Sequence, residues 1–240
     1  MKICLLGYGK MGKAIDNLAI SNNIEIKYRI SSDNKSNLFN ALQEVDVVIE
    51  FSKPELAVDH IKICTDIGVP IVCGTTGWLD QLTAVESIVK SSNGALLYSS
   101  NFSLGVNIFF NINKKLAKLM SQFNQYQCHI EEIHHLQKLD KPSGTAISLA
   151  SQIIENHNQF DQWTLDKANT NNSDLNILAY REDGVIGTHK IEYNSSIDQI
   201  TIQHKALSRD GFALGAILAA KWLVGKKGIY TMDDFLNFDK

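Results

Sequence analysis

Paired cysteines, long apolar runs and blocks of like charge are all missing from this sequence of 240 residues. Its four cysteines are scattered and form no CxxC pair, which favours reduced core thiols in a cytoplasmic protein over disulfide bonds or a zinc site. No apolar run approaches the roughly 20 residues that span a membrane, so we expect no membrane partner. A net charge of −3 without any lysine- or arginine-rich block gives no reason to expect a nucleic-acid partner either.

What the chain does have is a regular alternation of short apolar runs and helical patterns over its first hundred residues. The N-terminal apolar run is too short for a signal peptide and predicts a buried strand instead. Helices between such strands indicate right-handed βαβ units and a mostly parallel, Rossmann-like α/β sheet. Ser52, with Glu55 three residues on, predicts a capped start for one of the helices. The strands are predicted at residues 2–7, 24–30, 45–51, 69–74 and 94–100.

The pattern changes after residue 102, where we expect a second domain of the α+β type. Here the sequence predicts helices at 106–120, 145–156 and 212–224, and strands at 126–135, 187–194 and 198–207. The polar, asparagine-rich stretch 163–176 is predicted to be a loop. The last helix is almost wholly apolar, so we expect it to pack back on the first domain. The dinucleotide-binding domain is thus predicted to comprise residues 1–102 and 214–240, and the second domain residues 103–213.

The glycines Gly7, Gly9 and Gly12 have the GxGxxG spacing, directly after a predicted strand and before a predicted helix. In that context the motif predicts a dinucleotide site. The first glycine permits a tight turn, the second lets the backbone approach a pyrophosphate, and the third lets the helix pack close to the sheet. A plain glycine-rich turn is the alternative. The same loop adds the candidate cofactor-binding residues Tyr8, Lys10 and Met11.

The residue that would select between the two nicotinamide cofactors is ambiguous. A carboxylate for the ribose of NAD is expected about 20 positions after the glycine loop. The sequence places Ser31 or Ser32 there, with Asp33 just beyond and Lys35 nearby. Small hydroxyls beside a lysine would accept a 2′-phosphate, whereas Asp33 would bind a diol, so both NADH and NADPH stay open.

Two more loops follow predicted strands at the edge where open α/β sheets bind ligands. Their hydroxyls and small residues suit a nicotinamide ribose and carboxamide, although each could be an ordinary loop. The candidate residues are Gly74, Thr75 and Thr76 in the first loop, and Ser99, Ser100, Asn101 and Phe102 in the second.

Residues 131–145, EEIHHLQKLDKPSGT, contain adjacent histidines, His134 and His135. Neighbours on a strand point to opposite faces, and no zinc-type spacing is present, so we predict no metal. Free N–H groups at 143–145, at the start of a helix, would bind a carboxylate, and Lys138 and Lys141 would add positive charge. A histidine with an ordinary pKa could move a proton. The stretch predicts an anion-binding acid/base site, with a solvated charged loop as the alternative.

This stretch, E-x-HH-x-x-K-x-D-x-PSGT, resembles the signature of the dihydrodipicolinate reductase (4-hydroxy-tetrahydrodipicolinate reductase) family. The segments GYGKMG, IEFSKPE, CGTTGW, SSNFSLGVN, REDGVIGTHKI and HKALSRDGFALGA also follow the order of that family. The resemblance covers nearly the whole chain. It implies reduction of 4-hydroxy-tetrahydrodipicolinate by NADH or NADPH, with loss of water, in lysine and diaminopimelate biosynthesis. The family often has a glutamate at the end of the second strand, where this chain has ISSD.

The resemblance also implies roles for individual residues. His134 would be the acid/base residue and Lys138 a proton donor and anion ligand. The substrate, a small dicarboxylate, would be bound by His135, Ser143, Gly144 and Thr145. The cofactor would lie against residues 7–12, Ser31, 74–76 and 99–102. Family members form homotetramers through sheets of the second domain, for which strands 187–194 and 198–207 are suitable.

Two other functions share parts of this pattern. A sugar or aldehyde dehydrogenase would have a similar two-domain plan, but would carry its lysine in a different motif and would not need the Pro-Ser-Gly-Thr turn. A redox-sensing regulator would also bind a dinucleotide, but would need a basic pair of DNA-binding helices, and the sequence predicts none.

Overall fold

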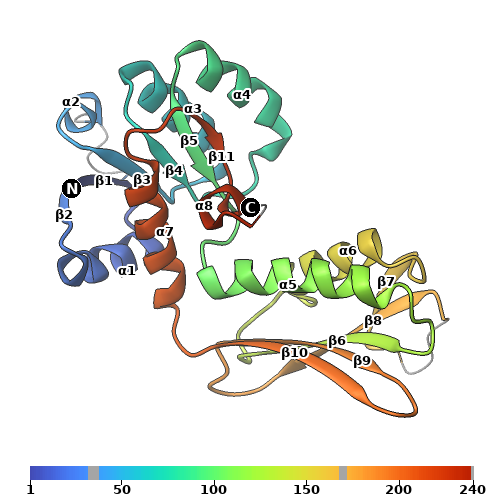
Figure 1. Cartoon of the computed structure of the whole chain (residues 1–240). Helices are drawn as coiled ribbons and strands as arrows, with labels where there is room; N and C mark the ends of the chain where they lie inside the picture. Colours follow the sequence, from blue (N-terminus) through green and yellow to red (C-terminus); the bar gives the residue numbers. More distant parts are fainter. Residues whose placement is uncertain (32–37, 168–171, 239–240) are drawn as a thin grey trace. The chain divides into compact units, whose positions relative to one another are not determined.

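The computed structural model describes residues 1–31, 38–167 and 172–238. The chain forms two compact units, Met1–Asn107 together with Asp210–Lys240, and Ile108–Arg209 (Figure 1). The second unit is therefore an insertion within the first. The helix α5 (Leu104–Met120) begins in the first unit and continues into the second. The limits expected from the sequence, at residues 102/103 and 213/214, fall a few residues from these divisions.

The first unit is built on a six-stranded sheet in which each neighbouring pair of strands is parallel. Its strands lie in the order β11 (Gly228–Tyr230), β5 (Ala95–Tyr98), β4 (Ile71–Cys73), β3 (Val47–Glu50), β1 (Lys2–Leu6) and β2 (Glu25–Ile30). Its helices are α1 (Lys10–Ala19), α2 (Leu38–Leu42), α3 (Pro54–Ile67), α4 (Leu82–Ser91), α7 (Asp210–Leu223) and α8 (Met232–Leu236), with short 3-10 turns at η1 (Ile20–Asn22) and η3 (Leu79–Gln81). The predicted Rossmann-like sheet is confirmed, with β11 as an additional edge strand that the sequence did not suggest.

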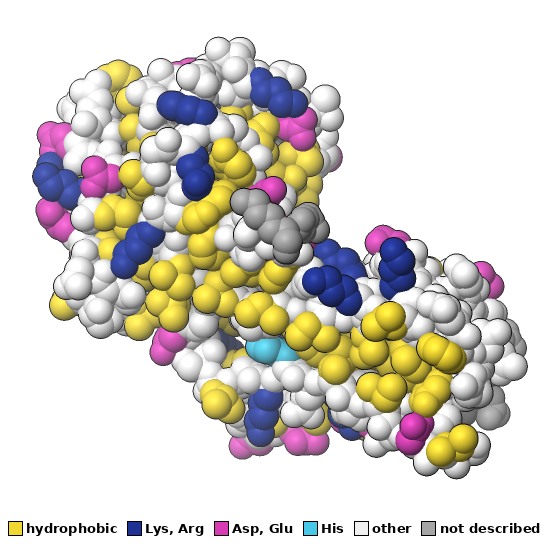
Figure 2. Space-filling model, viewed as in Figure 1, with side chains coloured by type: hydrophobic (Ala, Val, Ile, Leu, Met, Phe, Trp, Pro, Cys, Tyr) yellow, Lys and Arg dark blue, Asp and Glu magenta, His cyan; other side chains and the backbone are white. Residues whose placement is uncertain are grey.

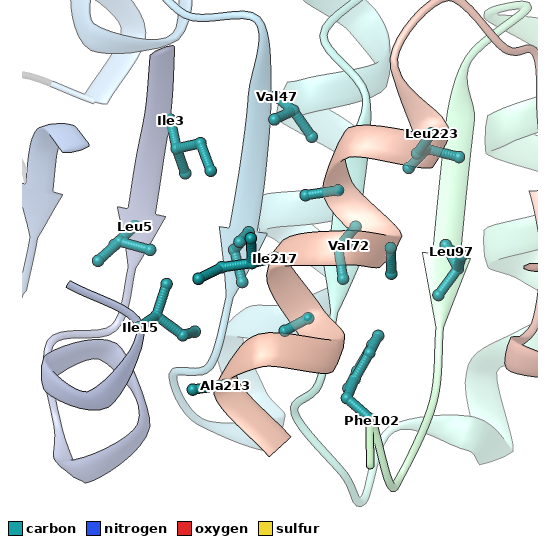
Figure 3. Close-up of a cluster of buried hydrophobic side chains, with 14 of the residues drawn as sticks. Ile3, Leu5, Ile15, Val47, Val72, Leu97, Phe102, Ala213, Ile217 and Leu223 are labelled. Atoms are coloured by element: carbon teal, nitrogen blue, oxygen red, sulfur yellow. The ribbon is translucent and has the colours of Figure 1, made fainter. Parts of the chain in front are cut away.

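Two apolar layers cover this sheet, one on each face. Helices α1 and α7 contribute to one layer, and α2, α3 and α4 to the other. Figure 3 shows α7 lying across the sheet, with Ala213, Ile217 and Leu223 facing the strands. The helix that was predicted to pack back on the first domain does so, because its apolar surface extends around most of its circumference.

The start of α3 differs from the prediction. Lys53, not Ser52, is the N-cap residue, and no side chain caps the helix. Pro54 occupies the first turn, where its missing N–H costs nothing. The Ser52 hydroxyl is used elsewhere, because it donates to the buried carboxylate of Glu50.

The second unit has a five-stranded mixed sheet in the order β10 (Gln199–Ala206), β9 (Gly187–Asn194), β6 (Gln127–His134), β8 (Asp174–Arg181) and β7 (Gln162–Leu165). The central strand β6 is antiparallel to β9 and parallel to β8. Helices α5 and α6 (Gly144–Asn156) share an apolar core with one face of this sheet. Glu131 of β6 and Lys190 of β9 form an ion pair on the other face.

The predicted loop 163–176 was wrong over most of the residues that the structure describes. Strand β7 overlaps its first part and β8 begins at Asp174. The polar residues that suggested a loop are satisfied across the strands: the Gln162 amide donates to Asp174, and the Asn176 amide to the Lys167 carbonyl. Residues 168–171 lie outside the described part of the chain.

Apolar side chains also remain on the outer face of α5 and just beyond its end. Ile108, Ile112, Leu119 and Phe123 are between 44% and 61% exposed. Figure 2 shows this strip as yellow side chains along the helix. Among the described residues, every helix is either too short or too polar to span a bilayer.

Candidate active site

The glycine loop joins β1 to α1, and each glycine meets a different requirement. Gly7 has a φ of +92°, and a Cβ there would lie 2.1 Å from the Phe51 carbonyl oxygen. A Cβ on Gly12 would lie 2.4 Å from the Gly7 carbonyl oxygen. Gly9 is different, because a Cβ there would meet nothing within 4 Å. The backbone at Gly9 therefore borders open space, and no side chain caps the first turn of α1. This geometry fits a pyrophosphate.

Two pockets in the first unit share this loop. The larger, about 530 Å³, is lined by Gly7, Tyr8, Gly9 and Ser31 of the predicted set, together with Leu6, Ile30, Leu38, Phe51, Ser52, Lys53, Leu56, Asp59, His60 and Ile63. The smaller, about 440 Å³, is lined by Gly9, Lys10, Met11, Gly74, Thr75 and Thr76 with Phe51, Ser52 and Pro54. Both lie at the carboxyl ends of parallel strands, as expected for a nucleotide site. Ser32, Asp33 and Lys35, which bear on cofactor preference, lie outside the described residues.

The predicted cofactor residues 99–102 do not line either pocket, and several of their polar groups are hydrogen-bonded within the loop. The Ser99 hydroxyl donates to the Asn101 carbonyl, and the Asn101 side chain accepts from the Ser103 N–H. Ser100 is exposed. Phe102 is 2% exposed, and its ring packs edge-on against Phe51 at 5.8 Å. The Phe102 side chain is therefore part of the protein interior.

Glu50, at the end of β3, is a buried carboxylate beneath both pockets that sequence reasoning missed. It accepts hydrogen bonds from the Ser52 N–H at 3.0 Å and from the Cys73 thiol at 3.2 Å. Burial works to raise the pKa of Glu50, but hydrogen bonds from His60, Ser52, Thr75 and Cys73 outweigh it and leave the pKa below its usual value. The anion holds Ser52, whose N–H also donates to the Thr75 hydroxyl at 2.9 Å. Glu50 thus fixes two loops that line the pockets.

Tyr8 is also held in place by the ion pair of Asp16 and Arg29, which the sequence did not suggest. Its hydroxyl donates to the carboxylate of Asp16 on α1. Arg29 on β2 donates to both oxygens of the same carboxylate, each at 2.6 Å. The hydrogen bond from Arg29 is the main reason that the pKa of Asp16 lies below its usual value. The aromatic wall of the larger pocket is therefore anchored to both α1 and β2.

The adjacent histidines are in the second unit, at the end of β6. His134 is the last residue of the strand and is 7% exposed, on the face that the helices cover. His135 follows the strand and is half-buried, with its Nε2 3.2 Å from the guanidinium of Arg209. The expectation that the two rings would diverge is therefore met, and only His134 enters the interior.

Glu132 lies two residues before His134, on the same face of β6, and is fully buried. Both of its carboxylate oxygens accept from the Ser143 N–H at 3.1 Å, and one lies 3.4 Å from Nη1 of Arg181. The other is 3.6 Å from Nδ1 of His134 and 3.7 Å from Nε2 of His189. The sequence analysis included Glu132 in the E-x-HH signature but predicted no role for it, although the period of two along a strand places it on the same face as His134.

His189, on β9, completes the buried cluster. Its Nε2 lies 3.1 Å from the Ser143 hydroxyl, and its ring meets that of His134 edge-to-face at 5.0 Å. Burial, helped by the positive charge that His134 can carry, lowers the pKa of His189 to about 3. Burial also lowers the pKa of His134, against the opposing effect of the Glu132 carboxylate. Both rings are thus neutral near pH 7.

The loop after the histidines is tied down by Arg181, at the end of β8. Arg181 donates to the carbonyl oxygens of Lys138 at 3.3 Å and Asp140 at 2.6 Å. The Lys138 ammonium lies 2.8 Å from both oxygens of Asp140. Lys141, which was expected to add charge to the same site, instead pairs with Asp166 at 2.7 Å.

The Pro-Ser-Gly-Thr turn opens α6, as predicted. Ser143 is the N-cap residue, and its hydroxyl accepts from the Ala146 N–H at 3.2 Å. Gly144 is exposed and Thr145 half-buried, and a Cβ on Gly144 would meet nothing within 4 Å. The first turn of α6 is therefore open to a carboxylate.

Within the part of the chain that the structure describes, Glu132, His134 and His189 lie close enough together to hold a metal ion. The same carboxylate already receives the Ser143 N–H and faces the Arg181 guanidinium. A fixed positive charge beside the carboxylate opposes a bound cation. The cluster is better suited to accepting and donating a proton than to binding a metal ion.

A parallel sheet with an open glycine loop, and a second sheet domain with a buried histidine and a helix whose first turn is open, are typical of an NAD(P)-dependent oxidoreductase of two domains. The family model "Dihydrodipicolinate reductase, N-terminus" matches residues 1–102, and "Dihydrodipicolinate reductase, C-terminus" matches residues 105–236. The chain belongs to the dihydrodipicolinate reductase family, which confirms the predicted family.

Curated relatives agree with this assignment. The 4-hydroxy-tetrahydrodipicolinate reductase of Christiangramia forsetii is 48% identical over 237 residues, covering 99% of this chain and 98% of the relative. That of Aquifex aeolicus is 39% identical over 215 residues, covering 84% and 77%. The chain is thus an NAD(P)H-dependent oxidoreductase acting in lysine and diaminopimelate biosynthesis, as predicted.

Solved structures support the fold. A dipicolinate-bound dihydrodipicolinate reductase from Paenisporosarcina sp. TG-14 aligns with a TM-score of 0.76 at 21% identity, covering 96% of this chain and 97% of that one. A scyllo-inositol dehydrogenase from Lactobacillus casei with bound NAD(H) aligns at a TM-score of 0.53 and 10% identity, covering 99% and 89%. The similar plan expected of a sugar dehydrogenase is therefore seen, at a greater structural distance.

Proposed function

We propose that His134 and Lys138 carry the acid/base chemistry of the family's reaction in this chain. That reaction converts 4-hydroxy-tetrahydrodipicolinate, NAD(P)H and a proton into tetrahydrodipicolinate, NAD(P)⁺ and water. The observation that supports the assignment is a buried imidazole, His134, in a cluster with the N-cap of a helix whose first turn is open. The bound cofactor supplies the hydride from C4 of its nicotinamide ring.

The substrate has two carboxylates, and the second unit offers groups that suit them. The N–H groups of Gly144 and Thr145, with the Thr145 hydroxyl, hold one carboxylate at the positive end of α6. When the substrate binds, the Lys138 ammonium leaves Asp140 and binds the second carboxylate of the substrate. His135 adds a further contact, and Ser143 keeps the helix start in place through its cap. Each of these groups lies on β6, α6 or the loop between them.

His134 is neutral before the substrate binds, because burial lowers its pKa. Two carboxylates close to the ring would stabilise the imidazolium form, so substrate binding favours the uptake of a proton. The charged ring then delivers that proton to the substrate. General acid/base catalysis of this kind raises the reaction rate by a factor of about 10²–10⁴.

In the first unit, the backbone at Gly9 and the first turn of α1 hold the pyrophosphate. Gly7 and Gly12 give the loop its shape, and Tyr8 and Ser31 form part of the wall of the larger pocket. Lys10, Met11 and the loop 74–76 line the smaller pocket. Residues 99–102 complete the site through backbone groups. We assign the dinucleotide-binding domain, predicted from the sequence as residues 1–102 plus 214–240, to the first unit, and the substrate-binding and tetramerisation domain, predicted as residues 103–213, to the second.

We further propose that the protein is a homotetramer that works in the cytoplasm. The sheet of the second unit has one helix-covered face and one face with charged side chains, and β9 and β10 offer that second face for contact between copies. All four cysteines are buried free thiols, in keeping with a reducing compartment.

The acid/base assignment is tested by His134→Gln and Lys138→Ala. Each should lower kcat by roughly 100-fold or more, while the Kd for NADH and for NADPH stays within about twofold, because both side chains belong to the second unit. The matched control is His129→Gln, on the same strand but the opposite face, where His129 pairs with Glu192 at 3.0 Å. Turnover is measured as NAD(P)H oxidation, with substrate generated in situ by the preceding synthase. Wild-type turnover in both variants would show that the assignment of His134 and Lys138 is wrong.

A further inference from the structure

Glu132 is a buried carboxylate to which neither the predicted site nor the proposed chemistry gives a role. It is fully buried, and polar groups from four different segments face it. These groups are the Ser143 N–H at the start of α6, Arg181 on β8, His189 on β9 and His134 on its own strand. A carboxylate in such a place fixes whatever donates to it, because moving a donor away would leave an unpaired buried anion.

The contact between Glu132 and His134 bears on which ring nitrogen of His134 carries the proton. An ionised carboxylate only accepts hydrogen bonds, so a ring nitrogen that faces it is favoured as N–H. Nδ1 of His134 is 3.6 Å from Glu132 and is otherwise buried without a partner. The two groups are not hydrogen-bonded at this separation, but a shift of a few tenths of an ångström would bring them within hydrogen-bond distance. Such a hydrogen bond would place the proton of neutral His134 on Nδ1 and leave a lone pair at Nε2.

The other edge of the ring is kept clear by Gly187, the first residue of β9. A Cβ at position 187 would lie 3.1 Å from Nε2 of His134 and 3.2 Å from its Cδ2. Any side chain there would crowd the nitrogen that bears the lone pair. Glycine leaves this edge of the imidazole uncovered, so that Nε2 is available to a reacting group.

We propose that Glu132 is a positioning residue that keeps the proton of neutral His134 on Nδ1, leaving Nε2 to take up and deliver the proton of the reaction. Through the Ser143 N–H the same carboxylate also holds the start of α6, where a substrate carboxylate binds. One buried side chain thus orients the acid/base group and also holds the helix start at which the carboxylate binds. This inference rests on the proposed role of His134.

The charge of Glu132 also acts on the protonation of His134, together with the other groups around the ring. Glu132 and Asp140 favour the imidazolium form, whereas Lys138 and Arg181 oppose it. On the neighbouring strands, His189 lies beside the ring, and His204 of β10 acts on His189. Removing the Glu132 charge should therefore shift the ionisation of His134 to lower pH.

The test compares Glu132→Gln with a matched control, Glu131→Gln, in the full-length protein. Glu131 is the adjacent residue on the opposite face, where it pairs with Lys190 at 3.1 Å. In Glu132→Gln the amide oxygen would accept the Ser143 N–H and leave the NH2 group facing Nδ1, which favours the Nε2–H tautomer. Nitrogen-15 NMR of labelled histidines reads the tautomer directly. We expect Nδ1–H for His134 in the wild type and in Glu131→Gln, and Nε2–H in Glu132→Gln.

Kinetics give a second readout. For Glu132→Gln we expect kcat to fall at least about 30-fold with the KM for NAD(P)H unchanged, and the alkaline limb of kcat/KM, which follows loss of the proton from His134, to move about one unit towards lower pH. If Glu132→Gln does not give a folded spectrum, Glu132→Asp replaces it. The aspartate keeps the charge and should keep His134 in the Nδ1–H form.

Three outcomes would overturn the proposal: an Nε2–H tautomer in the wild type, an Nε2–H tautomer in folded Glu132→Asp, or unchanged turnover and pH profile in Glu132→Gln. If turnover survives in Glu132→Gln but collapses in His134→Gln, the proposed function stands and Glu132 has no positioning role. If turnover survives in His134→Gln as well, the proposed site itself is wrong.

Discussion

His189 illustrates how burial fixes the protonation of a single side chain. It is 5% exposed, with the Ser143 hydroxyl beside Nε2 and the ring of His134 against its face. Its surroundings lower its pKa to about 3, far below the usual value of 6.5. The folded protein therefore keeps this ring neutral under conditions in which the unfolded chain would protonate it.

This difference makes the stability of the protein sensitive to acid. Between pH 6.5 and about 3 the unfolded chain binds a proton at His189 that the folded chain does not. The free energy of unfolding should therefore fall with decreasing pH over this window, by up to about 1.4 kcal/mol per pH unit from this group alone. Above pH 7 the group should contribute no slope. Urea unfolding of the wild type and of His189→Asn at several pH values measures the effect; equal slopes between pH 6.5 and 4.5 would contradict it.

At the same scale, the sequence showed part of the site and could not show the rest. The histidine pair and the Pro-Ser-Gly-Thr turn lie within one short stretch, so their proximity could be inferred. Glu132 was within reach of the same strand argument. Arg181 and His189 come from strands about 50 residues further on, and only the register of β6 with β8 and β9 brings them to the same carboxylate.

At the scale of elements, α7 shows how close backbone approach constrains a helix. Gly215 lies against the segment that follows β5, where a Cβ would be 1.7 Å from the Phe102 carbonyl oxygen. Gly211, one turn earlier, has only the Ser103 hydroxyl oxygen nearby, at 3.9 Å from the position of a Cβ. Two glycines of the same helix thus face very different surroundings.

Gly215→Ala should therefore destabilise the protein by about 3 kcal/mol or more, because helix and backbone must separate to admit the methyl group. Gly211→Ala should leave stability unchanged or raise it by about 0.5–1 kcal/mol, since alanine is the better helix former. Chemical denaturation followed by circular dichroism measures both. Similar values for the two variants would show that the close approach at Gly215 is not limiting.

The elements that could be read from the sequence are those with a clear period. Strand β9 was predicted at its observed limits, 187–194, because its apolar and polar residues alternate cleanly. Strands β7 and β8 were not predicted because their polar residues suggested a loop. The side chains of Asp174 and Asn176 are hydrogen-bonded, to the Gln162 amide and the Lys167 carbonyl, and composition does not reveal such bonds. Strand β11 is only three residues long, too short to show a period.

At the scale of the whole molecule, the proposed tetramer requires a sheet face that tolerates contact between copies. On that face the exposed Thr201 of β10 lies opposite Glu192 of β9. A lysine at position 201 would find a carboxylate within its own chain, so the monomer should remain folded, yet it would place a long charged side chain in the contact.

Thr201→Lys should therefore lower the oligomeric state from four copies, as measured by light scattering at several concentrations. Ala84→Lys, at an exposed position of α4 in the first unit, should leave it unchanged. A wild-type protein that is monomeric at micromolar concentration would disprove the tetramer. Four copies in Thr201→Lys would mean that the contact lies elsewhere.

The insertion of one unit within the other has a consequence for biosynthesis. Residues 108–209 emerge from the ribosome before α7, and α7 supplies seven buried residues to the nucleotide unit. The nascent chain can thus complete its second unit while one layer of the first still lacks its central helix. The unit that contains the N-terminus is thus the one whose last structural elements are translated last.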